Sequence, residues 1–388
     1  MRLTEIQTFI VGNPWKNWVF IKLHTDAGIH GVGEATVHRK AKTAEAALAE
    51  TRRYFLGLDP FAVEQLIDEM LKVGRGQVHM TALSAVEIAC YDIAGKALGT
   101  PVYNLLGGPY RRRIRAYANG WYTGPQTPEG FAQKALEVVG RGYAALKFDP
   151  FGSAHRTMSP RALRRALEVV AAVREAVGEE VELLIEGHGR FEPGFAAKVA
   201  RLLEPFNPGW FEEPVPSDDI AGTAEVAART TIPIAGGERL ASRQAFADLI
   251  DRGRVGVVQP DLLHTGGLLE TKKIAARAEV RGVAVAPHNA QGPVSTMACA
   301  HFAACTPGVC IQEVFDDFGV DWARRIVDPY PEVREGYLEI PERPGLGIDL
   351  NEAEMAKHPY DESHFLDLFG EGWEQRTKAK PLEDRCET

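Results

Sequence analysis

The fold is decided by the stretch Val181-Glu182-Leu183-Leu184-Ile185-Glu186-Gly187-His188, an apolar strand that ends in a carboxylate, a glycine and a histidine. Similar strand ends occur at Phe211, Gly237 and Pro260, so that Ile185 and these three positions are separated by 26, 26 and 23 residues. This spacing is the length of one strand plus one helix, and repeated βα units imply a parallel sheet. Strands that are apolar throughout are buried on both faces of such a sheet. We therefore predict an α/β fold.

The same repeat extends to both sides of this stretch. A helix is predicted from Ser159 onward, with Ser159 as its N-cap and Pro160 at the first helical position. Seven or eight such units close into a barrel. The predicted strands span residues 144–148, 181–185, 210–211, 232–235, 255–258, 283–286 and 309–311.

The N-terminal part of the chain follows a different pattern. Residues 18–23 and 29–35 predict an antiparallel hairpin around the turn Asp26-Ala27-Gly28. A helical stripe of apolar residues runs from 81 to 98 and is ended by Gly99. These elements predict an α+β unit that precedes the barrel.

Beyond Asp316 the βα repeat decays into loops. Residues 336–350 predict two short strands around Pro344-Gly345. We expect this segment to return to the N-terminal unit, because it does not continue the barrel. The predicted domains are an α+β capping domain (residues 1–112), the barrel with its catalytic rim (113–320) and the returning C-terminal segment (321–388).

Composition limits the classes of function. The 388 residues are 45% hydrophobic and 25% charged, which is ordinary globular usage, and the net charge of −9 argues against nucleic-acid or anionic membrane partners. No apolar run reaches the roughly 18 residues that span a bilayer. The five cysteines are an odd number without metal-type pair spacing, which argues against a disulfide framework and a zinc site. We expect a cytoplasmic protein, a homo-oligomer, whose partner is a small molecule.

Almost every predicted strand ends in a charged or titratable side chain. Such a residue by itself is more often a helix cap or part of a surface ion pair. The carboxyl ends of barrel strands, however, meet on one rim, where active sites are built. The coincidence across consecutive strands therefore predicts one site. Its members are Lys147, Asp149, Glu186, His188, Glu212, Glu238, Asp261, His288 and Glu313.

Three of these acids predict a metal site. Glu186, Glu212 and Glu238 end three consecutive strands, each 26 residues after the previous one. Carboxylates forced together repel one another, so a bound cation is the natural reason to collect them. With oxygen ligands alone the expected ion is hard, Mg²⁺ before Mn²⁺ or Ca²⁺. The neighbouring Glu213 must point to the other side of its strand and is expected to be structural.

Two histidines predict proton transfer. Asp261 and His288 end neighbouring strands, and an aspartate that accepts one ring N–H of a histidine fixes its tautomer and raises its basicity. His188 lies two residues after Glu186, so both side chains face the same way. A rim histidine without function is an equally common reading for His188 alone, but its place beside the acidic cluster favours chemistry. One histidine would remove a proton while the other donates one.

Taken together, six segments resemble a known family. They are Ile185-Glu186-Gly187-His188-Gly189-Arg190, Phe211-Glu212-Glu213-Pro214-Val215, Gly237-Glu238-Arg239, Gln259-Pro260-Asp261 with Gly266-Gly267, Ala286-Pro287-His288, and Gln312-Glu313. This set resembles the enolase superfamily, within it the mandelate racemase subgroup, and there the galactonate dehydratase-like acid-sugar dehydratases. The resemblance covers nearly the whole chain. It implies a modified (β/α)7β TIM-type barrel with a capping domain built from the N-terminal segment and the C-terminal return.

The resemblance also implies roles for the rim residues. Glu186, Glu212 and Glu238 match the Mg²⁺ ligands, and His288 with Asp261 matches the base. Enzymes of this superfamily use a lysine or histidine base with Mg²⁺ at the enediolate. The acid that hydrogen-bonds the enediolate is matched by Glu313, and the acid that assists the leaving hydroxide by His188.

Two positions depart from the family pattern. The first metal ligand is usually Asp, and Glu186 is one methylene longer. Racemase-type members carry Lys-x-Lys where this chain has Lys147-Phe148-Asp149, so the second base of a racemase is missing. Lys147 and Asp149 share a face and could hold substrate hydroxyls or form an internal ion pair. Arg239 and Lys147 are candidates for orienting the substrate, and Trp15 lies in a loop, 13–18, that could cover the site.

We therefore expect an Mg²⁺-dependent hydro-lyase acting on an aldonate or aldarate. His288 would take the C2 proton, the metal would stabilise the enediolate, and His188 would assist loss of the 3-hydroxyl to give a 2-keto-3-deoxy acid. The alternatives are an epimerase or cycloisomerase in which His188 is a base, a sugar-acid binding protein without turnover, and a Schiff-base lyase that uses Lys147.

Overall fold

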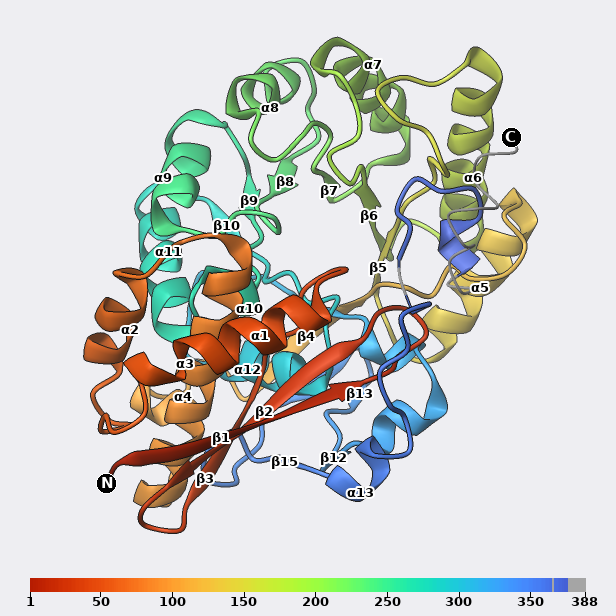
Figure 1. Cartoon of the computed structure of the whole chain (residues 1–388). Helices are drawn as coiled ribbons and strands as arrows, with labels where there is room; N and C mark the ends of the chain where they lie inside the picture. The colour runs from red at the N-terminus through yellow and green to blue at the C-terminus, as the bar shows by residue number, and fades with distance from the viewer. Residues whose placement is uncertain (365, 376–388) are drawn as a thin grey trace.

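A ring of parallel strands surrounded by helices forms the centre of the molecule (Figure 1). The computed structural model describes residues 1–364 and 366–375. Neighbouring strands pair in parallel from β4 through to β10, and β11 pairs in parallel with β4. A parallel bridge from Val285 in β10 to Val309, just before β11, links the two ends of this order. The strands are β4 (Arg113–Ala118), β5 (Ala145–Phe148), β6 (Glu182–Glu186), β7 (Trp210–Glu212), β8 (Ile234–Gly236), β9 (Val257–Val258), β10 (Ala284–Val285) and β11 (Gln312–Val314).

Helices alternate with these strands and cover the outside of the ring. As predicted, Ser159 caps the helix that begins at Pro160, and its hydroxyl accepts the N–H of Ala162. The alternation confirms the predicted modified (β/α)7β TIM-type α/β barrel. The helices are α5 (Pro128–Gly140), α6 (Pro160–Val177), α7 (Pro193–Leu203), η2 (Glu204–Phe206), α8 (Ile220–Ala227), α9 (Arg243–Arg252), α10 (Leu262–Thr265), α11 (Leu268–Val280) and α12 (Pro293–Ala304).

The sequence did not predict the first barrel strand, β4. This strand begins inside the basic cluster 111–115. Exposed or half-exposed arginines stand beside apolar residues there, so the sequence indicates a domain boundary rather than a strand. Ile114 and Ala116 are buried, whereas Arg115 is half-exposed and pairs with Glu182. One face of β4 therefore meets solvent at this end, unlike the strands that are apolar throughout.

The interior of the barrel is packed rather than hollow below the rim. Tyr117 and Trp210 meet edge to face there, with ring centroids 5.5 Å apart. Small alanines fill the space left between these rings, which leaves the catalytic rim above as the open end. The residues of this inner core are Tyr117, Ala145, Leu184, Trp210, Ala235, Val257, Ala286 and Ile311.

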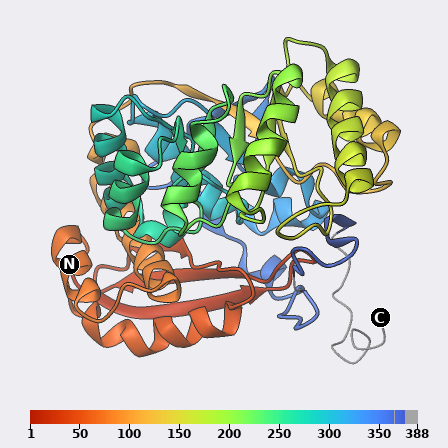
Figure 2. The same cartoon turned by 90° about the horizontal axis from the view of Figure 1, so that it is seen from above.

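The N-terminal unit lies against one end of the barrel (Figure 2). The predicted hairpin is present as β2 (Trp18–Thr25) and β3 (His30–Glu34), and the predicted helix as α3 (Gln77–Leu98), which Gly99 ends at a positive φ of 65°. A third strand, β1 (Leu3–Val11), pairs with β2 and was not predicted. The remaining helices are α1 (Ala41–Thr51), η1 (Arg52–Tyr54), α2 (Val63–Leu71) and α4 (Val102–Leu105).

The C-terminal segment returns to this N-terminal unit. Two short strands occur within 336–350 as predicted, but β14 pairs with β4 and β15 with β12, so they do not form a hairpin with each other. The return meets the N-terminal unit where the Leu346 N–H donates to Asp92 and where His30 pairs with Asp349. The elements are η3 (Asp316–Phe318), η4 (Asp321–Arg325), β12 (Val327–Asp328), β13 (Val333–Arg334), β14 (Tyr337–Glu339), β15 (Asp349–Leu350), α13 (Glu352–Met355) and η5 (Trp373–Gln375).

Within the described ranges, no helix is both long and apolar enough to cross a membrane. The predicted segment 321–388 extends beyond residue 375, and its last part lies outside the described residues. The domain boundaries stay predictions.

Asp92 is expected to be a main stabiliser of the return. Its buried carboxylate accepts the N–H groups of Val32 and Leu346 at 2.9 and 2.8 Å and pairs with Lys96. Asp92→Ala leaves two buried donors without a partner, at a cost of about 1–3 kcal/mol each in free energy of unfolding. Urea denaturation measures this loss. Glu64→Ala, which removes an exposed partner of Lys273, serves as control and should change stability by less than about 1 kcal/mol; equal effects would contradict the role of Asp92.

Candidate active site

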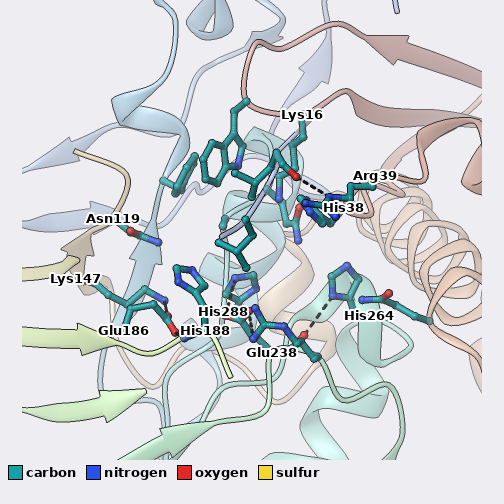
Figure 3. Close-up of a pocket in the computed structure, with 18 of the residues that line it drawn as sticks. Lys16, His38, Arg39, Asn119, Lys147, Glu186, His188, Glu238, His264 and His288 are labelled. Carbon is teal, nitrogen blue, oxygen red and sulfur yellow. Dashed lines mark hydrogen bonds and ion pairs between the residues drawn. The ribbon is translucent and has the colours of Figure 1, made fainter. Parts of the chain in front are cut away.

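A cavity of about 490 Å³ opens at the carboxyl ends of the barrel strands and is closed on one side by the N-terminal unit (Figure 3). Seven of the predicted site residues line it: Trp15, Lys147, Glu186, His188, Glu238, Arg239 and His288. Four others, Asp149, Glu212, Asp261 and Glu313, are buried behind this lining. The structure thus brings the predicted residues to one place.

The three predicted metal ligands lie together at the base of the cavity. Glu186 and Glu212 are direct neighbours in the register of β6 and β7, and Glu238 follows β8. One oxygen of each carboxylate lies within 4.8 Å of the others. Burial raises the pKa of all three, and for Glu212 burial and the adjacent Glu186 together raise the pKa to about 8. A bound cation would relieve the electrostatic repulsion among these three carboxylates.

The donor set fits a divalent cation. All three groups offer oxygen atoms, the ligands that hard ions prefer. Trp210 holds one oxygen of Glu212 at 2.9 Å, and the N–H of His188 donates to one oxygen of Glu186 at 2.6 Å. The other oxygen of Glu186 has no hydrogen-bond partner in the described part of the chain. A carboxylate has about four lone-pair positions, so each of the three acids can still bind an ion beside these contacts.

Lys147 contributes a positive charge to the same cluster. Its buried ammonium lies 3.2 Å from Glu186, 2.5 Å from Glu212 and 3.1 Å from Glu313. Burial acts to lower its pKa, but the surrounding carboxylates raise it well above the usual value. Lys147 is therefore an ammonium, and it pairs with these glutamates rather than with Asp149.

Asp261 holds His288 in the orientation of a base. The two residues are joined by a backbone bridge between neighbouring strand ends, and Nδ1 of His288 lies 2.7 Å from the Asp261 carboxylate. The ring therefore presents Nε2 to the cavity, 3.3 Å from Glu238. Burial opposes protonation, yet the carboxylates of Glu238, Glu313 and Asp261 raise the pKa of His288 to about 9.

His188 belongs to a second histidine–aspartate pair. Its Nδ1 lies 2.6 Å from Asp149, whose carboxylate also binds Arg190. The backbone of His188 has a positive φ of 51°, which turns the side chain from the strand end toward the cavity. Burial, followed by Arg190, lowers the pKa of His188 well below its usual value. Trp373 packs edge-on against the ring at 5.3 Å.

Asp149 and Glu313 are both buried and held by contacts from other residues of the protein. Asp149 was predicted to contact substrate, but it does not line the cavity, and its carboxylate is occupied by His188, Arg190 and the N–H of Phe151. Burial raises the pKa of Glu313, but Lys147, His288 and donors from two asparagines lower it to about 2. Its predicted hydrogen bond to a reaction intermediate stays a prediction, because a proton must first be placed on this carboxyl.

Arg239 and Trp15 form parts of the cavity wall. The guanidinium of Arg239 pairs with Glu213 and lies 2.8 Å from Glu238, so Glu213 has the structural role expected of it. Trp15 packs on Phe315 with ring centroids 4.9 Å apart. The loop that carries Trp15 therefore covers the cavity from the side of the N-terminal unit.

Several residues of the cavity were not predicted from the sequence. Lys16 lies in the covering loop, and burial lowers its pKa to about 8. His264 lies between Asp261 and the following glycine pair, inside a motif whose other members were recognised. Other polar lining residues lie in loops without a motif of their own; among them are His38, Asn119, Tyr122 and Gln291.

Comparisons with known proteins agree with this arrangement. Residues 6–107 match the mandelate racemase / muconate lactonizing enzyme N-terminal domain, and residues 130–354 match the enolase C-terminal domain-like family. The chain is 39% identical to a D-gluconate/D-galactonate dehydratase of Picrophilus torridus over 90% of both chains, and 35% identical to a D-galactonate dehydratase of Ralstonia nicotianae over 91% of this chain and 93% of that one. A crystal structure of a mandelate racemase/muconate lactonizing enzyme from Jannaschia sp. CCS1 superimposes with a TM-score of 0.88 at 33% identity, covering 93% of this chain and 98% of that one.

Glu212→Gln is expected to weaken metal binding, because it removes the charge of the carboxylate at the centre of the three-strand set. Calorimetric titration with Mg²⁺ should show a loss of affinity of at least about tenfold, since charge is the main attraction for a hard ion. Glu182→Gln, at the opposite end of β6, should bind Mg²⁺ as the wild type does. Unchanged affinity in Glu212→Gln would remove this residue from the ligand set.

Proposed function

Because this chain belongs to the mandelate racemase and muconate lactonizing enzyme family of the enolase superfamily, as the sequence predicted, we propose that it is a hydro-lyase that dehydrates a sugar acid, an aldonate or an aldarate. The observation that carries the proposal is the pair of histidines, each held by an aspartate, beside three carboxylates in one cavity. The homologous dehydratases give the reaction class.

The proposed cofactor is Mg²⁺, held by Glu186, Glu212 and Glu238. When bound, it would draw electrons from the substrate carboxylate and make the neighbouring C–H proton easier to remove. The ammonium of Lys147 adds positive charge next to the proposed ion, since it lies against two of the acids that would bind that ion. A buried, ion-paired ammonium is not a nucleophile, which argues against the Schiff-base lyase.

His288 is the proposed base. Asp261 accepts its Nδ1–H, so Nε2 faces the substrate. Once Nε2 has released the proton that the raised pKa favours, it takes the proton from C2 of the substrate. Gln291 and the N–H of Leu263 hold the aspartate itself, at 2.8 Å each. This support keeps the ring in place while it gains a positive charge.

His188 is the proposed acid. After the proton has left C2, the bond between C3 and its hydroxyl breaks, and His188 donates a proton so that water leaves. The resulting enol rearranges to a 2-keto-3-deoxy acid. Asp149, which binds Nδ1, orients the ring so that Nε2 faces the cavity and stabilises the imidazolium that must form before each donation. We propose this positioning role for Asp149 in place of a contact to substrate.

Homo-oligomeric assembly and a cytoplasmic location stay predictions. The size of the cavity supports a small-molecule partner, because a volume of about 490 Å³ is typical of a pocket for one metabolite.

A panel of aldonates and aldarates tests the proposed function. With Mg²⁺, at least one acid should yield a keto acid, and EDTA should abolish the reaction until Mg²⁺ is restored, because the proposed ligands are all carboxylates. Keto-acid formation is measured by a colorimetric assay. Substrate of inverted configuration and deuterated at C2 after reaction in D₂O would indicate an epimerase. Binding without any product would indicate a sugar-acid binding protein.

The two histidines should differ when each is replaced by asparagine. His288→Asn should lose both product and exchange of the C2 hydrogen with solvent deuterium, because both require proton removal. His188→Asn should form product about 10² to 10⁴ times more slowly, the usual loss when a general acid is removed, while exchange at C2 continues. NMR in D₂O measures both rates. If His188→Asn lost exchange as completely as His288→Asn with metal binding intact, His188 would be a base and the epimerase would be favoured.

A further inference from the structure

Three buried side chains of the cavity each carry a polar atom that the chemistry above does not use. Lys16, His264 and Gln291 line the cavity and are only 6%, 5% and 2% exposed. Nε2 of His264 and Oε1 of Gln291 form no hydrogen bond to the described residues, and the Lys16 ammonium forms no hydrogen bond or ion pair with them. Buried polar groups are normally paired, so these three atoms are expected to meet a ligand.

The unpartnered groups are oriented by contacts on their other side. Nδ1 of His264 lies 3.4 Å from the carbonyl oxygen of Glu238, which leaves Nε2 on the cavity side. The amide nitrogen of Gln291 donates to Asp261 at 2.8 Å, which leaves its oxygen unpaired. The amide assignment follows from this hydrogen bond. Nε2 of His264 and Oε1 of Gln291 are therefore fixed in position and available for a hydrogen bond to a ligand.

Their position relative to the reacting groups is visible in Figure 3. Lys147 and Glu186 lie at the left of the view and His188 and His288 near its middle, whereas His264 lies at the right and Lys16 at the top. A sugar acid whose carboxylate lies at the acidic cluster and whose C2 and C3 lie between the histidines would extend its remaining carbons toward Lys16 and His264.

We propose that Lys16, His264 and Gln291 form a subsite for the hydroxyl groups of the substrate beyond C3. The proposal rests on the proposed function. A hydroxyl is a donor and an acceptor, so it can donate to the oxygen of Gln291, accept from the ammonium of Lys16, and satisfy Nε2 of His264 whether or not that nitrogen carries a proton. Neither a methyl nor a carboxylate can satisfy all three groups.

The test compares two acids that differ only beyond C3. They are a six-carbon aldonate dehydrated by the wild type and the 4,5,6-trideoxy acid with the same configuration at C2 and C3. His264→Asn, which can keep a donor for the Glu238 carbonyl but loses Nε2, and Lys16→Met should each lower kcat/KM for the aldonate about ten- to a hundredfold and for the trideoxy acid less than about threefold. Lys16→Arg should recover part of the loss.

A binding measurement and a control complete the experiment. In a His288→Asn background with Mg²⁺, calorimetry should give the same ratios in Kd without turnover. His301→Asn, in which both nitrogens of a buried histidine outside the cavity lose their partners, should affect both acids equally. Equal losses on both acids in His264→Asn and Lys16→Met would overturn the subsite while leaving the dehydratase intact. If no polyhydroxy acid were bound or converted by the wild type, the proposed function would fail and the subsite with it.

Discussion

Mutual repulsion among buried carboxylates is the constraint on which the rest of the structure depends. Glu186, Glu212 and Glu238 end adjacent strands, so the barrel itself forces them together. Lys147, from the preceding strand, offsets part of this charge, and a divalent cation would offset more. The site is thus costly for the folded protein and is maintained because the packed barrel below it determines where the strands end.

The N-terminal unit also holds the part of the barrel that carries the base. Glu34 of β3 accepts the N–H groups of Gly292 and Ser295 at the start of α12, at 2.7 and 2.9 Å. Glu87 of α3 accepts two N–H groups at the start of α11, at 2.9 and 2.8 Å. Carboxylates at helix N-termini satisfy free donors and complement the helix dipole. Helix α12 follows β10, the strand that leads to His288, and α11 follows β9, the strand that leads to Asp261. Docking of the N-terminal unit therefore also helps to align the base.

The two histidine–aspartate pairs of the cavity differ in the pKa of their histidines. Asp261 belongs to a well-supported pair in which the ring gains basicity, whereas Asp149 shares its charge with Arg190, and the pKa of His188 is lowered well below the usual value. A histidine with a lowered pKa gives up its proton readily, and one with a raised pKa takes a proton readily. Similar pairs thus acquire opposite tendencies from their surroundings, and this difference could not be predicted from the order of residues.

What the sequence by itself determined is local and periodic. The apolar strands, the Ser159 cap, the turn at residues 26–28 and the charged or titratable side chain at the end of almost every strand follow from covalent spacing. These features were enough to predict the barrel, the family and the cluster of acids. Only the tertiary structure decided which side chains meet across the cavity. Asp149 meets His188 and not Lys147, and Lys16 reaches the barrel from the N-terminal unit, because long-range packing sets these neighbours. Contacts between distant segments depend on how whole elements dock, and no short pattern in the chain encodes that docking.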